Sequence, residues 1–340
     1  MALCIGLDAH AKTCVYVVKD DAGTTVDRGT LPSTPADLSL LAERYPGAEV
    51  VVEASSVTEW IVDRLTDLGM AVVPAHPVNI RRVLGKKNDE VDAGFLVDAH
   101  RLGCLPRSYV PPKPIRALRQ LARRCAFLTK ERTRFKNRVH AILKRRGIRF
   151  LDPDTEDDVP DVFARKHRDR LLAVDDPEIP VLLELIDAVT GKREALDEEL
   201  LAVSQGTPDV RWLRTIPGFG PLVAVALYAE AGDLSRFRSA DAFAAYLGLV
   251  PTEAQSGETR VRGHITRRGP GHVRWLLNQA AWQHARLCPS SSVTKDYRRL
   301  LRRAGRKRAI TAASRRLARV GYCLLRERRP FTLNDHGRAS

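Results

Sequence analysis

The sequence of 340 residues predicts an α/β domain at its N-terminal end, followed by two largely helical segments. Two patterns lead to this fold class. Short valine-rich runs separated by turn residues fill residues 3–31, and a strand–helix–strand pattern fills residues 48–74. Beyond residue 115 the apolar spacing is mostly helical. We therefore expect α/β plus all-α domains, with a hydrophobic content of 44% that suffices for sizeable cores.

The N-terminal domain is expected to contain five strands and three helices. The strands are expected over residues 3–7, 14–19, 24–31, 48–53 and 71–74, and the helices over 34–44, 56–68 and 89–102. Thr34 is expected to cap the first helix, with Pro35 at its first position, and Ser56 or Thr58 to cap the second. Three antiparallel strands that then join parallel βα units are typical of an α/β sandwich of the ribonuclease H type.

The rest of the chain divides into a helical arm and a C-terminal helical domain. Helices are expected over residues 115–146, 163–173, 179–203, 222–231, 239–247, 272–286 and 307–327. Residues 106–114 form a proline-rich linker, residues 153–162 an acidic loop, and residues 251–271 a Gly-rich polar loop. The predicted domains are therefore 1–105, an arm of coiled-coil type over 106–205 that is first basic and then acidic, and 206–330.

Charge is unevenly distributed along the chain. The net charge is +15, but residues 101–150 carry 16 basic and one acidic side chain, whereas residues 151–200 carry 6 basic and 16 acidic ones. The last 90 residues are again basic, with 21 basic and 5 acidic side chains. Clustered positive charge favours binding to phosphate backbones. The alternative is a solvated, Arg-rich surface, or pairing of the basic helix with the acidic segment inside the arm.

The cysteines and the N-terminal residues indicate a reducing compartment. Six scattered cysteines contain no CxxC pair, which disfavours a disulfide framework or a cysteine-rich zinc site. The first residues carry no basic region and meet Asp8 early, and no apolar run approaches the ~18 residues of a membrane span. We expect a cytoplasmic protein that acts at the nucleoid and has no membrane partner.

Four carboxylates fall at informative places in the predicted α/β domain. Asp8 ends the first strand, Glu53 ends the fourth, and Asp89 and Asp92 lie at i and i+3 on one helix face. In a ribonuclease H-type sheet the ends of these two strands are adjacent, so the four acids could converge. Mg²⁺ prefers hard oxygen ligands, and two such ions ~3.5–4 Å apart would clamp the oxygens of a phosphoryl transfer. Taken singly, each acid is more typical of a turn, a helix cap or a helix-dipole contact.

Three segments resemble one family of enzymes. The segments G-L-D-A-H-A-K near the start, V-V-V-E-A-S in the middle and K-K-N-D-E-V-D-A before a helix are similar to those of the DEDD transposases. These belong to the insertion-sequence family numbered one hundred and ten, the bridge-RNA-guided serine recombinases. The resemblance implies a RuvC-like N-terminal domain in which Asp8, Glu53, Asp89 and Asp92 are the catalytic and metal-binding DEDD set. Asn88 stands where Thr or Ser is more usual in the family.

A second region resembles the serine-bearing domain of the same family. It runs from Y-L-G-L-V-P-T-E-A-Q-S-G at 246–257 through G-H-I-T-R-R-G at 263–269 to H-V-R-W-L-L at 272–277. The resemblance implies that Ser256 is a nucleophile that forms a phosphoserine ester with DNA. From the residues alone, a Ser-Gly pair in a loop is typical of a turn.

Further residues are candidates for nucleic-acid contacts. The segment Ile216–Leu222 is similar to a helix-hairpin-helix turn, whose glycines let backbone N–H groups approach a phosphate. The alternative is a helix–helix turn with glycine in the left-handed region. The full candidate set is Lys86, Lys87, Arg123, Arg124, Arg134, Lys136, Arg138, Gly218, Gly220, Arg260, Arg262, Arg267 and Arg268.

The resemblance implies a transposase that excises and inserts its own insertion sequence. It further implies Mg²⁺, donor and target double-stranded DNA, a structured guide (bridge) RNA, and a homo-oligomer, dimer or tetramer. One alternative is a RuvC-like two-metal nuclease of the junction-resolvase type, without a covalent intermediate. A kinase of the actin type is disfavoured because no later Gly-rich adenosine motif follows I-G-L-D-A-H-A-K-T. A nucleic-acid-binding protein without activity is disfavoured because the four acids and the serine are all present.

Overall fold

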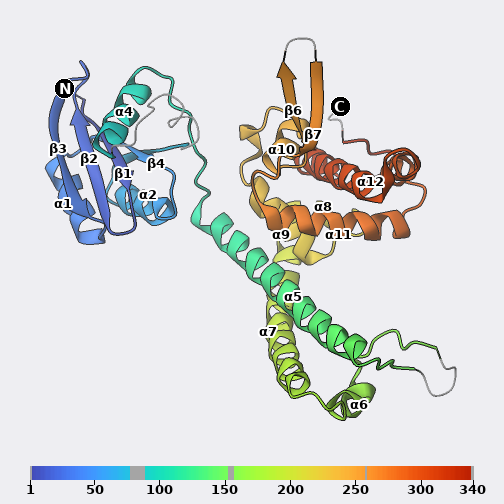
Figure 1. Cartoon of the computed structure of the whole chain (residues 1–340). Coiled ribbons are helices and arrows are strands. Elements are labelled where there is room, and N and C mark those ends of the chain that lie inside the picture. Colours follow the sequence, from blue (N-terminus) through green and yellow to red (C-terminus); the bar gives the residue numbers. More distant parts are fainter. Residues whose placement is uncertain (1, 77–88, 152–156, 257–258, 338–340) are drawn as a thin grey trace. The chain divides into compact units, whose positions relative to one another are not determined.

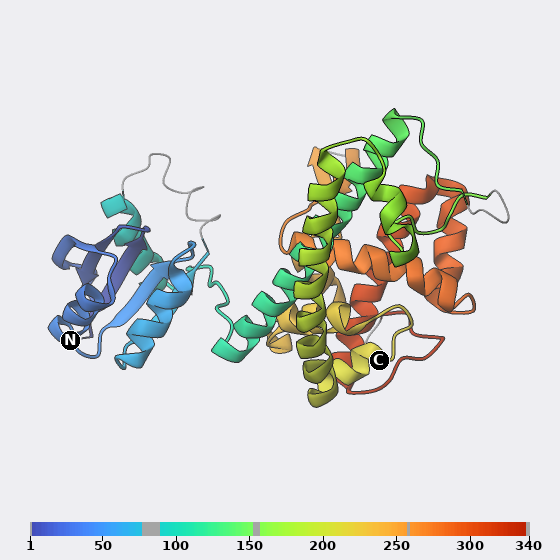
Figure 2. The same ribbon diagram turned by 90° about the horizontal axis from the view of Figure 1, so that it is seen from below.

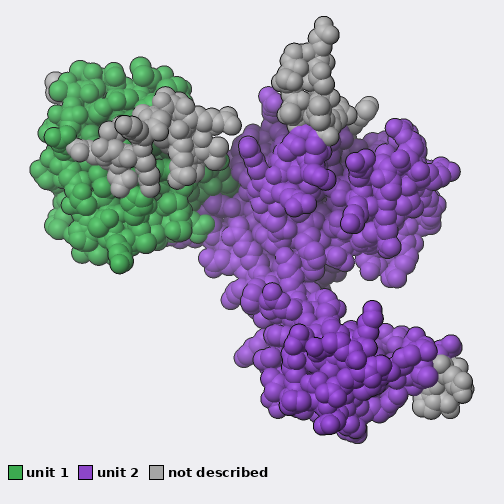
Figure 3. Space-filling view, viewed as in Figure 1, with its two compact units in different colours: residues 1–110 green, residues 111–340 purple. Residues whose placement is uncertain are grey.

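The computed structural model describes residues 2–76, 89–151, 157–256 and 259–337, without the side chains of residues 89–91, 253–256 and 259–262. The chain forms two compact units, Met1–Val110 and Pro111–Ser340 (Figure 3). Our division into 1–105, 106–205 and 206–330 stays a prediction. Among the described residues, no helix combines the length and apolar content that crossing a bilayer requires.

The first unit is built on a five-stranded sheet with the order β3-β2-β1-β4-β5 (Figure 1). The strands are β1 (Cys4–Ala9), β2 (Thr13–Lys19), β3 (Thr25–Pro32), β4 (Glu49–Glu53) and β5 (Ala71–Ala75). β1, β2 and β3 pair antiparallel, whereas β4 is parallel to β1 and β5 is parallel to β4. This mixed sheet, together with its helices, supports the expected ribonuclease H-like arrangement of the N-terminal domain.

Helices cover both faces of this sheet. α1 (Pro35–Arg44) and α2 (Thr58–Asp67) bury Leu38 and Ile61 against one face. α4 (Asp89–Arg101) lies on the other face, where its Leu96 packs with Val51 of β4. Because successive side chains of a strand point to opposite faces, these contacts fix which strand residues face α4.

The helix caps match the sequence in one case and differ in another. Thr34 caps α1 and its side chain accepts a hydrogen bond from the N–H of Asp37, as predicted. The predicted caps of α2 are wrong, because its N-cap is Val57, which makes no side-chain bond. Thr58 is used instead to close the turn after β4, where its Oγ1 donates to the carbonyl of Glu53 at 3.0 Å and accepts from the N–H of Ser55 at 2.7 Å.

The second unit begins with a pair of long helices. α5 (Lys113–Arg145) and α7 (Glu178–Gly206) lie side by side in Figures 1 and 2. They run antiparallel, because Arg193 of α7 contacts Thr129 while Glu178 contacts Arg138 further along α5. The predicted helix over 163–173 is shorter than expected, a 3-10 turn at Arg165–His167 followed by α6 (Arg168–Leu172).

The remaining elements of this unit share one large core. They are α8 (Pro208–Arg214), a 3-10 turn (Leu234–Arg236), α9 (Pro221–Ala231), α10 (Ala240–Tyr246), α11 (Gly271–Leu287) and α12 (Ser292–Glu327). Leu213, Phe243, Leu277 and Leu317 are fully buried in this core. Ser239 caps α10, as its position before an apolar run indicates.

One expectation for this region is wrong and another is confirmed. Residues 251–271 are not all loop, because β6 (Pro251–Ser256) and β7 (Thr259–Ile265) form an antiparallel hairpin, so the C-terminal part is not all-α. The glycine content masked the alternation of Val261 and Ile265 with polar neighbours. The helix expected over 307–327 is confirmed as the part of α12 that follows the non-helical backbone at Gly305, whereas the part from Ser292 to this break was not predicted.

Candidate active site

The two strand-end carboxylates occupy matching places on neighbouring parallel strands. Leu7 of β1 pairs with Val52 of β4, so the residues that follow them, Asp8 and Glu53, stand at the same edge of the sheet. This edge is the carboxyl end of both strands. Asp8 is 4% exposed, and Glu53 is partly buried.

Both carboxylates belong to the face of the sheet that α4 covers. Ile5 and Leu7 pack into the core beneath α1 and α2, so Gly6 and Asp8 lie on the opposite face. Val51 packs against α4, so Glu53, two residues later, lies on that same face.

The direction of α4 brings its N-terminal acids to this edge. His100, near the end of α4, contacts Glu49 at the start of β4, with Nε2 and Oε2 2.8 Å apart. Asp98 pairs with Lys19, whose strand partner is Cys4 at the start of β1, with Nζ and Oδ2 2.6 Å apart. Since the helix ends at the amino ends of β1 and β4, its beginning, with Asp89 and Asp92, lies toward their carboxyl ends.

A glycine allows the close approach of helix and strand. A Cβ atom on Gly6 would lie 1.9 Å from the carbonyl oxygen of Ala93. The backbone of α4 therefore touches β1 one residue after Asp92 and two residues before Asp8. This crossing brings Asp92 near the strand-end carboxylates.

The surroundings of Asp8 are charged and enclosed. His10 Nε2 lies 3.4 Å from Asp8 Oδ2. The pKa of the Cys14 thiol is raised, chiefly because the group is buried and additionally because the Asp8 carboxylate is near. Among the side chains that the structure describes, no three His, Cys, Asp or Glu groups lie close enough to hold a metal ion, and the side chain of Asp89 lies outside that set. The donor set of carboxylate oxygens fits Mg²⁺ by its chemistry. Lys86 and Lys87 lie outside the described residues.

The predicted nucleophile stands at the end of a hairpin strand. Ser256 is the last residue of β6 and pairs with Thr259 of β7, while Arg260 pairs with Gln255. Arg262 pairs with Glu253, and the side chains of all these residues lie outside the described part.

The base of the hairpin is held by one arginine. Arg274 of α11 donates to the carbonyl oxygens of Leu247, Arg268 and Gly269 at 3.0, 2.9 and 3.1 Å. Arg267 takes a positive φ of 54° and, like Arg268, is exposed. A cavity of about 230 Å³ opens here between Arg267, Arg274 and Trp275.

The basic residues predicted on α5 divide into paired and outward-facing ones. Arg138 forms a bidentate contact with Glu178, at 2.6 and 2.8 Å, and Lys136 lies 4.0 Å from Asp161. Arg134 contacts Glu131 of its own helix. Pairing of the basic helix with the acidic segment therefore occurs, while Arg124 is exposed.

The two glycines of the predicted phosphate-binding turn differ in their surroundings. Gly218 has a φ of +92° and packs so closely on α11 that a Cβ would lie 2.7 Å from the carbonyl oxygen of Ala280. Gly220 is the exposed N-cap of α9 with open space around it. Gly218 thus has a packing role, and phosphate binding by either glycine stays a prediction.

Sequence reasoning missed a buried charge cluster around Glu230. This carboxylate is 2% exposed and contacts Arg123 at 2.9 Å, Tyr246 at 3.2 Å and His272 at 3.5 Å. Burial lowers the pKa of His272 to about 4 against the opposing effect of Glu230. The only sequence signal was an acid inside the apolar segment of α9.

Comparisons with known proteins show which family the chain is similar to. A family model described as "Transposase IS116/IS110/IS902 family" matches residues 210–298, and a model named for the DEDD transposase of IS110 matches residues 5–147. The chain is 26% identical over 302 residues to the "Probable family 20 transposase" of Pseudomonas aeruginosa, covering 83% of this chain and 85% of that protein. It is also 26% identical over 302 residues to the transposase for insertion sequence element IS1111A of Coxiella burnetii, covering 85% of this chain and 80% of that one.

One solved structure also matches the chain. It is T. thermophilus RuvC in complex with a Holliday junction substrate, at a TM-score of 0.26 and 11% identity, covering 32% of this chain and 100% of that chain. The fold of the first unit rests on the order and directions of its own strands.

Proposed function

Because the chain belongs to the IS116/IS110/IS902 family of transposases, we propose that it excises and inserts its own insertion sequence by Mg²⁺-dependent strand cleavage through a phosphoserine DNA intermediate. The observation that carries this proposal is the arrangement of Asp8, Glu53 and Asp92. Two adjacent strands and one helix direct these acids to the same edge and face of the sheet.

The acids would act as ligands for divalent ions. Asp8, Glu53, Asp89 and Asp92 would hold two Mg²⁺ ions per site, which would stabilise negative charge on phosphoryl oxygens.

Ser256 would carry the covalent step. Its hydroxyl loses a proton, Oγ forms a bond to phosphorus, and the bond from phosphorus to one deoxyribose oxygen breaks while that oxygen takes up a proton. Attack by a sugar hydroxyl on the phosphoserine ester reverses the step and joins a new strand. The neighbouring arginines of β7, Arg260 and Arg262, would offset the negative charge of the transition state.

Partners follow from the same proposal. We assign donor and target double-stranded DNA as substrates, with a structured guide RNA that pairs with both, so that base pairing supplies sequence choice. A homo-oligomer would let the serine of one protomer complete the acid site of another.

The test compares cleavage by single acid variants. Asp92→Asn should abolish Mg²⁺-dependent cleavage of DNA that contains the element's ends and retain nucleic-acid binding, because it removes a metal ligand without changing size. Asp67→Asn is the matched control, since Asp67 is an exposed acid at the end of α2. Full activity of Asp92→Asn would remove this residue from the site.

A RuvC-like nuclease without a covalent step remains the second candidate, because the acid site alone suffices for two-metal hydrolysis. Cleavage that depends on Asp92 but not on Ser256 would select it.

A further inference from the structure

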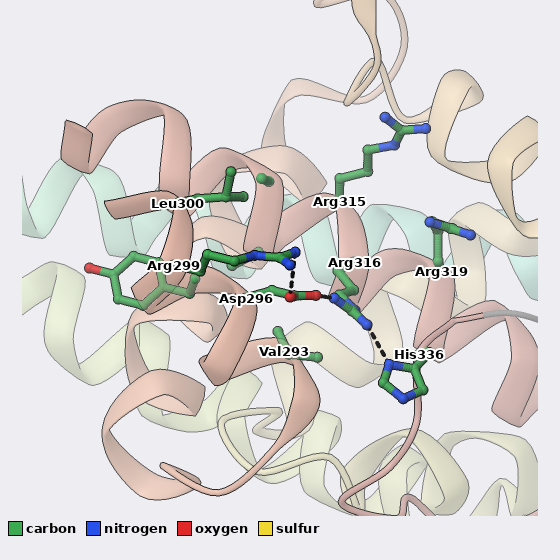
Figure 4. A pocket seen from close by; sticks show the side chains of 11 residues that line it. Val293, Asp296, Arg299, Leu300, Arg315, Arg316, Arg319 and His336 are labelled. Atoms are coloured by element: carbon green, nitrogen blue, oxygen red, sulfur yellow. Dashed lines mark hydrogen bonds and ion pairs between the residues drawn. The ribbon is translucent and has the colours of Figure 1, made fainter. Parts of the chain in front are cut away.

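The two parts of α12 enclose a pocket of about 550 Å³ (Figure 4). Gly305 interrupts the helix with a φ of 77° and a ψ of 167°. Side chains from before this break, such as Tyr297 and Arg299, and from after it, such as Arg315 and Arg319, line the same space. The tail residue His336 closes one side of the pocket.

Positive charge dominates the lining of this pocket. Arg299 contacts Asp296 at 2.8 Å, and Arg316 also pairs with Asp296, as the dashed lines of Figure 4 show. Arg315 and Arg319 share Asp241, at 2.8 and 3.4 Å. Four arginines and one aspartate line the described pocket, so its lining carries an excess of positive charge.

Two of the arginines that line the pocket are partly buried. The side chains of Arg315 and Arg319 are 34% and 23% exposed. The Nε of Arg315 is buried and has no hydrogen-bond acceptor among the described residues. A ligand in the pocket would reach the exposed parts of these guanidinium groups and not the buried Nε. The oxygens of a phosphate are acceptors that arginine binds strongly.

Apolar and aromatic side chains line the same pocket. Val293, Leu300 and Ala313 line it, and the half-buried ring of Tyr297 stands edge-on to Trp282, with ring centroids 5.9 Å apart. A lining that combines arginines with an aromatic ring matches a phosphate attached to an aromatic base. Single-stranded nucleic acids are bound in this way, by cations on the backbone and rings against the bases.

We propose that this pocket binds one nucleotide of a single-stranded nucleic acid, with its phosphate on Arg315 and Arg319 and its base against Tyr297. The proposal rests on the proposed function only in taking a nucleic acid as the partner. The strand could be RNA or DNA, because both supply a phosphate and a base.

The test uses the full-length protein and short fluorescent oligouridine RNA and oligothymidine DNA, with binding followed by anisotropy. Arg315→Gln removes a phosphate contact, and Ala312→Trp fills the pocket without changing the charge. Each should weaken binding about tenfold, within the range that loss of one stacked base produces. Arg303→Gln is the matched control, because Arg303 is exposed on the same helix outside the pocket, and it should change binding less than about twofold.

Competition identifies the ligand. Uridine monophosphate should displace the oligonucleotide from the wild type and not from Ala312→Trp, whereas inorganic phosphate should displace it only at much higher concentration. The proposal would be overturned if Arg303→Gln and Arg315→Gln weakened binding equally. It would also be overturned if Ala312→Trp bound normally and kept the unfolding midpoint of the wild type. If Arg315→Gln unfolds, Ala312→Trp alone decides.

Nucleotide binding in this pocket can be tested separately from the proposed function. Ser256→Ala should bind the oligonucleotides like the wild type, because Ser256 is not a lining residue. Normal pocket binding by a wild type that never forms a covalent DNA adduct would reject the serine mechanism and retain the pocket.

Discussion

At the scale of single residues, the carboxylate of Glu230 joins α9 to three other helices of the second unit, α5, α10 and α11. It lies in α9 and contacts Arg123 of α5 and His272 of α11, and Arg119 donates to the backbone carbonyls of Ala229 and Glu230 at 2.8 and 3.1 Å. A buried charge of this kind is tolerated because it is paired, and removal of its partners would leave it uncompensated.

This cluster predicts a pH dependence of stability. The pKa of His272 is lowered by burial to about 4 in the folded chain, below its ordinary value of 6.5. The unfolded chain therefore binds more protons between these values, so the free energy of unfolding should fall as the pH drops from 6.5 toward 4 and should be fully restored above 6.5. Urea unfolding across this range measures the slope.

The matched variants isolate that histidine. His272→Asn should reduce the slope, because the side chain no longer titrates, whereas His264→Asn, at an exposed position on the hairpin, should leave it unchanged. Equal slopes for the wild type and His272→Asn would contradict the assignment.

At the scale of elements, the contact between α4 and β1 determines where the acids stand. Gly6 meets the backbone of Ala93, which cannot move aside as a flexible side chain can. The position of the helix, and with it Asp92, therefore depends on the absence of a side chain at Gly6.

Gly6→Ala should consequently lower both stability and activity. The added methyl group forces α4 off the sheet, with a destabilisation of about 1–3 kcal/mol typical of overpacking. DNA cleavage should be lost even in the fraction that remains folded, as measured by urea unfolding and a cleavage assay.

Gly94→Ala is the control on the same helix. Its new Cβ would meet its nearest neighbour, on Lys19, only at 3.9 Å, and alanine favours a helix over glycine by about 0.5–1 kcal/mol. It should therefore be tolerated. Unimpaired cleavage by Gly6→Ala would show that the approach of α4 does not position the acids.

Much of this arrangement could be predicted from local sequence patterns. Thr34 followed by Pro35 located the start of α1, and the run ending in Glu53 located β4, because caps and buried strands have local signatures. The role of Gly6 could not be predicted, since it arises from contact with Ala93, far away in the sequence. Lone glycines within a strand do, however, indicate close backbone approach.

Other features depended on tertiary contacts that no local pattern carries. The hairpin around Ser256 was missed because glycine and polar residues are typical of a loop. The two strands form here because their backbones pair with each other. The pocket of α12 arises from the break at Gly305, which brings together arginines that are separated in the sequence. The site residues themselves were located by resemblance and topology together, and their roles stay predictions.

At the scale of the whole molecule, the basic side chains divide into those that pair with acidic side chains and those that face solvent. The acidic segment neutralises part of α5, as the contact between Arg138 and Glu178 shows, while Arg124 faces outward. Affinity for nucleic acid should therefore depend on particular arginines more than on the net charge of +15.

Salt titration tests this distribution. If some 6–10 phosphates are neutralised, affinity for DNA should fall about 10³–10⁵-fold between about 50 and 200 mM salt. Arg124→Gln should reduce the log–log slope by about 0.9, and Arg138→Gln by less, because Glu178 already occupies that guanidinium. A flat salt response would contradict the predicted contacts.

The guide RNA gives a further test on the intact protein. Protein purified from cells that carry the complete element should retain a discrete transcript from the DNA that flanks its gene. Sequencing of the bound RNA checks this, and recovery of only random cellular RNA would count against RNA guidance.

The most direct measurement is a denaturing gel of the protein after incubation with its flanking RNA, donor DNA and target DNA in Mg²⁺. We predict a covalent protein–DNA adduct that forms with the wild type and is absent from Ser256→Ala, while Asp67→Asn forms it normally. Strand cleavage without an adduct, unaffected by Ser256→Ala, would contradict the serine mechanism and would indicate a two-metal nuclease.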